Sequence, residues 1–301
     1  MKTNKALIEN NKYIIQNYQR YPIEIIKGDG SFIWDSKGKK YLDFISGIAV
    51  NNLGHNNSKV NKAISSQLQK ILHISNLFVI KEQVNYAKEL YNKKLGYQTF
   101  FCNSGTEANE AAFKLSRRWG MLNGKRSTIV SFSGAFHGRT FGSLSATSPK
   151  KYRFGFYPLT PGFKSIEFNN LSELEKLLNK NKKIVAIIVE PIQGEAGVKF
   201  SDKGFLNKIQ ELCRKNNILF IVDEVQVGIG RTGKTFCHEH YNLSPDIITL
   251  AKALGGGLPC GAIMVHPRLS ESLSPGSHGT TMGGNPLSMV AGLASFKQIS
   301  K

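Results

Sequence analysis

Two adjacent carboxylates, Asp223 and Glu224, directly follow the apolar run Ile218–Val222. The run is short, rich in β-branched residues and bounded by polar ones, which predicts a buried strand. Ligands of open α/β sheets bind at the carboxyl ends of the strands, so this pair is placed to face a ligand. An isolated Asp-Glu pair is equally expected as a strand end that is hydrogen-bonded to the next loop, and both interpretations stand at this point.

Lys252 lies between the apolar run Ile247–Leu250 and the glycines at 255–257. Its apolar neighbours Ala251, Ala253 and Leu254 predict partial desolvation, which lowers the pKa of an amine and makes the neutral, imine-forming amine available. The glycines permit close approach of a flat cofactor. A lysine before a glycine-rich loop is also commonly a phosphate contact or a surface residue.

The segment Asn103–Asn109 is a small-residue turn that opens a predicted helix. Free backbone N–H groups and the positive end of the helix dipole make such a turn an anion site, suited to a phosphate. The spacing of Ser104 and Glu107 also fits a capping box, and the two interpretations are compatible.

The elements that position these residues alternate along the chain. Apolar, β-branched runs predict buried strands, and segments with apolar residues at intervals of three and four predict helices. This alternation predicts an α/β fold whose mainly parallel sheet is covered by helices on both faces. The strands are expected at 128–132, 184–189, 218–222, 247–250 and 262–265, and the helices at 107–119, 171–179, 203–216 and 288–299.

Residues 1–45 depart from this alternation, because turns at 28–30 and 36–38 separate short strands. We therefore expect 1–45 to form the N-terminal part of a small domain and 46–301 to form the large, ligand-binding domain. A predicted helix at 288–299 runs to the end of the chain without a Gly or Pro stop signal, so we expect a C-terminal portion to be absent.

Composition excludes several classes of protein. The 301 residues are 41% hydrophobic, which supplies a sizeable core. No stretch approaches the roughly 18 uninterrupted apolar residues of a membrane span, and the N-terminus lacks the apolar region of a secretory signal. A cytoplasmic protein without a membrane partner is expected.

Charge and cysteines do not indicate another function. The formal net charge is +19, but the lysines are scattered without an aromatic-interleaved stripe, so no nucleic-acid partner is expected. Four separated cysteines favour buried thiols over disulfides. The segment Cys237–His240 has no second cluster to complete a metal site, so no metal is expected.

Taken together, the three chemical segments resemble the class III (subgroup II) aminotransferases, which depend on pyridoxal 5′-phosphate (PLP). The resemblance runs from about Tyr18 to the last residue and implies PLP-dependent transferase fold type I, with an incomplete small α+β domain. The Phe-His-Gly-Arg and His-Gly-Thr-Thr stretches are most similar to the acetylornithine type. Further matching segments are 41–50, 135–140, 190–194, 228–233 and 278–286.

The resemblance implies a role for each matching residue. Lys252 would bind PLP covalently as an imine and then act as general acid and base, while Asp223 would keep the pyridine nitrogen protonated. For His137, beside Phe136, a structural role is the simpler expectation. The remaining cofactor residues implied are Gly105 and Thr106 for the phosphate, Phe136 and Val225 for the two faces of the ring, and Gln226 for the 3′-oxygen.

It also implies substrates and a partner. Arg139, Glu190 and Thr280 would contact the substrate, and Thr281 would bind the phosphate across the interface of a homodimer. The donor implied is N2-acetylornithine and the acceptor 2-oxoglutarate, in arginine biosynthesis. Ornithine, 4-aminobutyrate and succinylornithine are alternative donors, and a PLP-binding remnant with little activity is another alternative. Family members continue beyond Lys301 with an arginine that binds the α-carboxylate, so poor transamination is expected.

Overall fold

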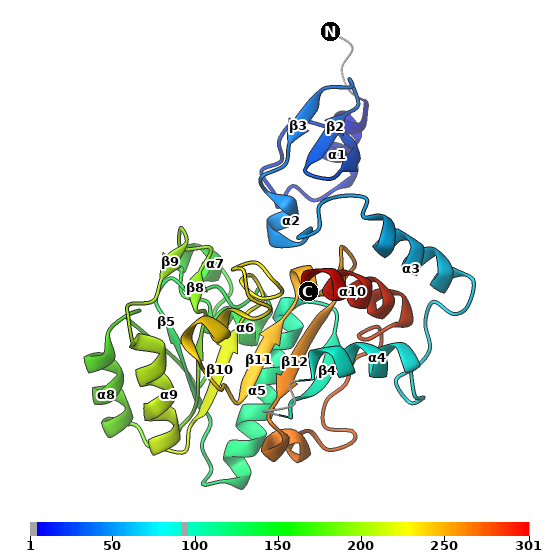
Figure 1. Cartoon of the computed structure of the whole chain (residues 1–301). Helices are drawn as coiled ribbons and strands as arrows, with labels where there is room; N and C mark the ends of the chain where they lie inside the picture. The colour runs from blue at the N-terminus through cyan, green and yellow to red at the C-terminus, as the bar shows by residue number, and fades with distance from the viewer. Residues whose placement is uncertain (1–4, 92–95, 301) are drawn as a thin grey trace.

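The computed structural model describes residues 5–91 and 96–300, and its centre is a seven-stranded sheet (Figure 1). Strand β12 is antiparallel to both of its neighbours, β11 and β4, and the other adjacent pairs are parallel. The predicted mainly parallel sheet is therefore confirmed. In spatial order the strands are β4 (Gln98–Cys102), β12 (Gly261–Val265), β11 (Ile247–Leu250), β10 (Leu219–Asp223), β7 (Ile184–Val189), β5 (Thr128–Phe132) and β6 (Phe163–Ile166).

Apolar side chains on both faces explain why the central strands form uninterrupted hydrophobic runs. In β10, Leu219 and Ile221 belong to one buried cluster, whereas Phe220 and Val222 belong to another on the opposite face. Successive side chains of a strand point to opposite faces, so a sheet covered on both sides buries every residue.

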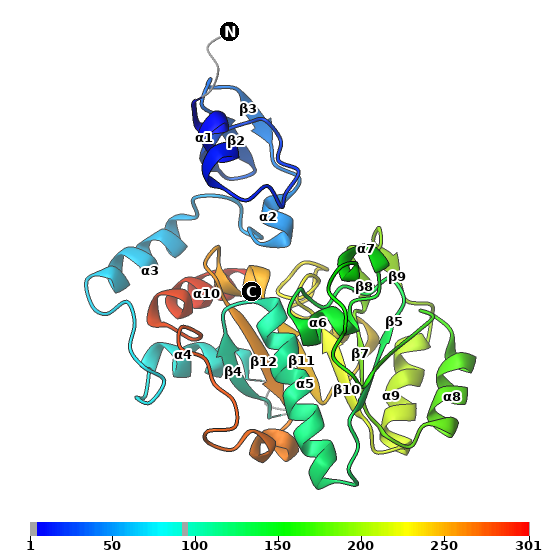
Figure 2. The same ribbon diagram turned by 180° about the vertical axis from the view of Figure 1, so that it is seen from behind.

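Helices supply the two covering layers (Figures 1 and 2). Helix α5 (Gly105–Leu122) packs on one face, together with α6 (Phe141–Ala146). The opposite face is covered by α8 (Leu171–Lys180), α9 (Phe205–Lys215), α10 (Pro286–Ile299) and α4 (Lys81–Leu90). Shorter elements are α7 (Lys150–Arg153), β8 (Ile192–Gln193), β9 (Lys199–Phe200) and the 3₁₀ helices η1 (Cys237–Tyr241), η2 (Lys252–Gly255) and η3 (Pro267–Leu273).

The N-terminal segment has a sheet of its own, which lies apart from the central sheet in both views (Figures 1 and 2). The predicted turn at 36–38 lies between the second and third of its antiparallel strands, whereas Gly28 and Asp29 of the turn predicted at 28–30 still pair within the first strand, and the chain turns at Gly30 and Ser31. The domain boundary near residue 45 stays a prediction. The segment comprises α1 (Lys5–Tyr13), β1 (Ile25–Asp29), β2 (Phe32–Asp35) and β3 (Lys40–Leu42), followed by α2 (Ser46–Ala49) and α3 (Ser58–Leu68).

The lengths and hydropathies of the helices bear on the expected absence of a membrane span. In the part of the chain that the structure describes, every helix is too short or too polar to cross a membrane.

Candidate active site

A cavity of about 460 Å³ opens at the carboxyl-end edge of the central sheet. Strands β4, β7, β10 and β11 run in the same direction, so the segments that follow them meet at this edge. This topology gathers residues from distant parts of the sequence. The predicted site residues that line the cavity are Gly105, Thr106, Phe136, Arg139, Glu190, Asp223, Val225, Gln226 and Lys252.

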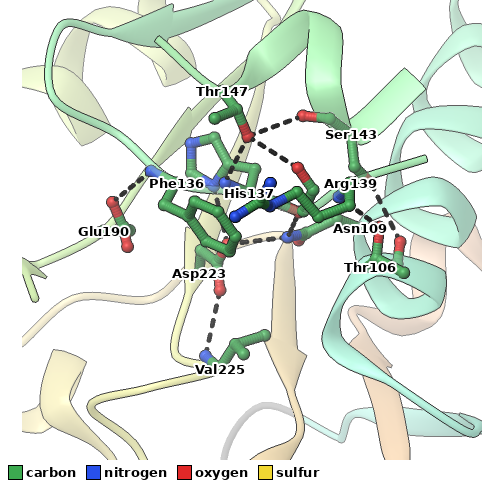
Figure 3. Close-up of polar contacts among 11 residues, drawn as sticks. Thr106, Asn109, Phe136, His137, Arg139, Ser143, Thr147, Glu190, Asp223 and Val225 are labelled. Atoms are coloured by element: carbon green, nitrogen blue, oxygen red, sulfur yellow. Dashed lines mark hydrogen bonds and ion pairs between the residues drawn. The ribbon is translucent and has the colours of Figure 1, made fainter. Parts of the chain in front are cut away.

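Asp223 ends β10, and its carboxylate accepts three hydrogen bonds (Figure 3). Its Oδ1 accepts a hydrogen bond from the Val225 N–H at 3.0 Å, and its Oδ2 accepts from Asn109 Nδ2 at 2.8 Å and from His137 Nδ1 at 2.7 Å. Burial opposes ionisation, but the hydrogen bond and charge of His137, with the Val225 and Asn109 bonds, hold the pKa of Asp223 below its ordinary value. The cavity wall therefore carries a buried anionic carboxylate.

His137 is 2% exposed and is fixed on three sides. Its backbone N–H donates to Thr147 Oγ1 at 2.9 Å, and its carbonyl accepts from Asn109 Nδ2 at 2.7 Å. Because an ionised carboxylate only accepts, Nδ1 carries the proton that bonds Asp223, while the buried Nε2 has no partner among the described residues. The sequence did not reveal that His137 and Asn109 jointly hold Asp223.

Glu224 points away from this cavity into the fold. Its carboxylate accepts hydrogen bonds from the N–H groups of Cys237 and His238, both at 2.7 Å, and from His238 Nδ1 at 2.7 Å. Of the two predicted carboxylates, one thus lines the cavity and the other ties a strand end to a loop. The described residues contain no group of three or more His, Cys, Asp or Glu that could hold a metal ion.

Lys252 begins η2, two residues after the end of β11. Its φ of 48° lies in the left-handed region, which is uncommon for a residue with a side chain and recurs at functional sites. Burial lowers its pKa, and the nearby carboxylates of Asp223, Glu195 and Glu190 partly offset this effect. The amine is neutral at lower pH than that of an ordinary lysine, in line with the apolar neighbours in the sequence.

The first turn of α5 forms a further part of the cavity lining. Ser104 caps the helix by accepting from the Glu107 N–H at 3.2 Å, and Glu107 Oε2 reaches back to the Asn103 N–H at 2.6 Å. The N–H groups of Gly105 and Thr106 lie in the first turn, where no carbonyl of the helix accepts from them. They are therefore available to an anion in the cavity.

Glu190 follows β7 and is buried, with its Oε2 accepting from the Phe136 N–H at 3.1 Å. Burial, followed by repulsion from Asp223, raises the pKa of Glu190 well above its usual range. Exposed Glu195, which the sequence did not single out, lines the same cavity and accepts from Gln226 Nε2 at 3.4 Å. The buried carboxyl therefore anchors Phe136, and the exposed one faces solvent.

Thr280 and Thr281 lie outside this cavity and line a second one of about 600 Å³. Thr280 remains linked to the first cavity, because its Oγ1 accepts a hydrogen bond from Asn103 Nδ2 at 3.2 Å. Thr281 is exposed. One chain alone therefore does not bring Thr281 to the cavity.

The residues of the cavity fit PLP. They supply an amine of lowered pKa in Lys252, an anionic carboxylate in Asp223, an aromatic ring in Phe136 and an anion site at the start of α5. Val225 packs so close to the first turn of α5 that a Cβ on Gly105 would lie 2.6 Å from Val225 Cγ1. A volume of about 460 Å³ is in the range of small-molecule sites.

Comparison with known proteins finds relatives that match 96% of this chain. It is 45% identical to the acetylornithine aminotransferase of Aquifex aeolicus over 295 residues (96% of this chain and 77% of the relative). It is 47% identical to that of Methanocaldococcus jannaschii over 292 residues (96% and 73%).

Solved structures show the same fold, that of the PLP-dependent aminotransferases of fold type I. The ornithine aminotransferase of Toxoplasma gondii matches with a TM-score of 0.93 at 32% identity, covering 98% of this chain and 70% of that one. The acetylornithine aminotransferase of Elizabethkingia anophelis matches with a TM-score of 0.85 at 36% identity (99% and 73%). The family model for class-III aminotransferases matches residues 13–301, and the chain therefore belongs to this family of PLP-dependent enzymes.

Proposed function

We propose that this chain transfers the side-chain amino group of N2-acetylornithine to 2-oxoglutarate, giving the semialdehyde and glutamate, in the cytoplasm and in arginine biosynthesis. The observation that carries the proposal is that Lys252 and Asp223 line one cavity at the N-terminus of α5. The donor is supported by relatives named acetylornithine aminotransferase, which are 42–47% identical over 95–96% of this chain. Among the solved structures, the acetylornithine aminotransferases of Stenotrophomonas maltophilia and Elizabethkingia anophelis are 34% and 36% identical, and the ornithine aminotransferase of Toxoplasma gondii is 32% identical.

Lys252 and Asp223 are the proposed catalytic residues. When bound, PLP supplies an aldehyde that condenses with amines and a ring that withdraws electrons from the adjacent carbon. Lys252 Nζ, with its lowered pKa, provides the amine that holds the cofactor and afterwards accepts and returns the proton of the reacting carbon. Asp223, kept anionic by His137 and Asn109, holds a proton on the ring nitrogen.

The other cofactor contacts follow from the walls of the cavity. Gly105 and Thr106 would bind the phosphate through the free N–H groups of the first turn of α5. Phe136 and Val225 would contact the two faces of the ring, and Gln226 would donate to its 3′-oxygen through Nε2. All five residues line the cavity, which supports this assignment.

Substrate recognition is assigned to Arg139, Glu190 and Thr280. Arg139 is exposed at the cavity, where its guanidinium offers two parallel donors to a carboxylate. Glu190 is buried behind Phe136, so its effect on the substrate would pass through that residue. Thr280 reaches the cavity through Asn103.

A homodimer is the proposed assembly, with Thr281 completing the phosphate site of the partner. Support comes from the surface around the second cavity, which Leu77 lines. Three consecutive apolar side chains are exposed there, namely Leu77 (92% exposed), Phe78 and Val79 (91%). Apolar exposure on this scale marks interaction surfaces. We further propose that residues 1–45 belong to a small domain and residues 46–301 to the large PLP-binding domain.

Borohydride reduction of the PLP-loaded protein tests the assignment. Peptide mass spectrometry should find the pyridoxyl label on Lys252, and Lys252→Ala should abolish the label. A label on another lysine would contradict the site. The donor is tested separately by kcat/KM for N2-acetylornithine, ornithine, 4-aminobutyrate and succinylornithine, and a higher value for any of the last three would overturn the donor while leaving the site intact.

A further inference from the structure

The guanidinium of Arg139 lies against two aromatic rings. Its Cζ is 4.3 Å from the ring centroid of Tyr152 and 5.4 Å from that of Phe136. The two rings meet edge to face, with centroids 5.4 Å apart and planes inclined at 78°. Figure 3 shows the side chains of Arg139 and Phe136 lying alongside each other above Asp223.

The backbone of Arg139 is fixed independently of these rings. Its N–H donates to Thr106 Oγ1 at 3.2 Å, which ties it to the first turn of α5. The preceding residue, Gly138, has a φ of 135°, and a Cβ there would overlap the Thr106 side chain. The loop is therefore held tightly on α5, and the remaining freedom lies in the long Arg139 side chain.

The charge of Arg139 is free for a ligand. Within residues 5–91 and 96–300, no Asp or Glu forms an ion pair with its guanidinium. The rings of Tyr152 and Phe136 attract the Arg139 guanidinium through their quadrupoles. Because neither ring carries a negative charge, the positive charge of Arg139 is not neutralised. The in-plane N–H groups are thus left to bind a carboxylate.

We propose that Tyr152 is a positioning residue that determines specificity for carboxylate substrates: its ring holds the Arg139 guanidinium against Phe136 at one place in the cavity. Tyr152 lies in α7, outside the lining of the cavity, so it acts through Arg139 and not by touching the substrate. The proposal rests on the proposed contact between Arg139 and the substrate carboxylate.

The aromatic ring of Tyr152, and not its hydroxyl, is the part that holds Arg139. A variant that keeps the ring and one that removes it should therefore differ in substrate binding. Tyr152→Phe keeps the ring and should bind like the wild type, whereas Tyr152→Leu removes it. Lys151 provides the matched control, because its Nζ lies 4.9 Å from the centroid of the same ring while Lys151, unlike Arg139, does not line the cavity. Lys151→Ala should therefore leave the position of Arg139 unchanged.

The first measurement does not depend on turnover. The PLP-loaded protein is treated with phenylglyoxal, and modification of Arg139 is followed by peptide mass spectrometry. Tyr152→Leu should speed modification about three- to tenfold, as expected for loss of one cation–π contact at a partly exposed site. Tyr152→Phe and Lys151→Ala should keep the wild-type rate. An unchanged rate in Tyr152→Leu, or an equal increase in Tyr152→Phe, would overturn the proposal.

The second measurement is the affinity for glutarate, a dicarboxylate without the reactive carbonyl, together with KM and kcat for 2-oxoglutarate. In Tyr152→Leu the glutarate Kd and the KM should rise about three- to tenfold while kcat stays near that of the wild type. Arg139→Ala separates the two hypotheses. If Arg139→Ala weakens glutarate binding and Tyr152→Leu does not, only the proposed role of Tyr152 fails. If Arg139→Ala binds glutarate with wild-type affinity, the carboxylate contact of Arg139 is wrong, and the role of Tyr152 fails with it. Tyr152→Met, also without a ring, replaces Tyr152→Leu if the latter does not fold.

Discussion

His137 Nδ1 lies 2.7 Å from Asp223 Oδ2. Glu224, the residue after Asp223, has the same kind of partner, because His238 Nδ1 lies 2.7 Å from Glu224 Oε1. All four side chains are buried. The two pairs leave the end of β10 in different directions, and only the first lines the cavity. One strand end therefore provides both a chemical carboxylate and a structural one, each held by its own histidine.

This duplication permits a matched comparison of His137→Leu with His238→Leu. Each variant removes one partner of a buried pair, so each should lower the free energy of unfolding by about 3–5 kcal/mol in urea titrations. Only His137→Leu should also weaken PLP binding, because it removes the hydrogen bond that helps hold the cavity-lining carboxylate of Asp223 in its anionic form. Equal loss of PLP affinity in both variants would show that the effect is global and that His137 has no special link to the cofactor.

Lys252 should react with amine reagents at lower pH than a surface lysine. Burial lowers its pKa, so the nucleophilic, neutral amine appears earlier as the pH rises. Lys208 is the internal comparison, because its hydrogen bond to Glu211 raises its pKa. Reductive methylation of the PLP-free protein between pH 6 and 10, read by peptide mass spectrometry, should label Lys252 before Lys208. Labelling of Lys208 before Lys252 would contradict the lowered pKa of Lys252.

Much of this fold could be predicted from the sequence because its strands are buried on both faces. The predicted strands at 128–132, 184–189 and 247–250 have the same bounds as β5, β7 and β11. Strand β6 (Phe163–Ile166) gave no such signal, because it lies at the sheet edge and two of its four residues are exposed.

In the site, the features that depend on neighbouring residues in the sequence could be predicted, and those that depend on distant residues could not. The desolvation of Lys252 was predictable from its immediate neighbours. The contacts of Asp223 with Asn109 and His137 join residues 114 and 86 positions apart, and no local pattern encodes them. The different surroundings of Glu190 and Glu195, one buried and one exposed, likewise depend on how the chain folds back over Phe136.

Glu190→Gln should become more stable relative to the wild type as the pH rises. The folded-state pKa of Glu190 is raised, so its contribution to stability is complete below its unfolded pKa of about 4.5 and is lost as the pH rises through the folded value. Glutamine keeps an acceptor for the Phe136 N–H and cannot ionise. Urea unfolding between pH 5 and 9 should show the difference growing in favour of the variant, by about 1.4 kcal/mol per pKa unit of displacement that is titrated.

The exposed neighbour supplies the control for that experiment. Glu195→Gln removes a carboxyl group from the same cavity at an exposed position, so an equal pH trend in the two variants would show that the trend does not come from the burial of Glu190. A pH-independent difference for Glu190→Gln would mean that Glu190 is ionised in the folded protein.

Gly138→Ala should disturb both stability and ligand binding, and Gly204→Ala separates the two causes. Both glycines have positive φ, at 135° and 81°, so each alanine is strained, by about 1 kcal/mol near the left-handed region at Gly204 and by more at Gly138. A Cβ at Gly204 would meet no atom within 4 Å, whereas one at Gly138 would overlap Thr106. Gly138→Ala should therefore lose a further 1–3 kcal/mol or so from overpacking. Because the displaced loop carries Arg139, this variant alone should also weaken glutarate binding in calorimetric titrations, and equal stability losses in the two alanine variants would show that the loop is not held against α5.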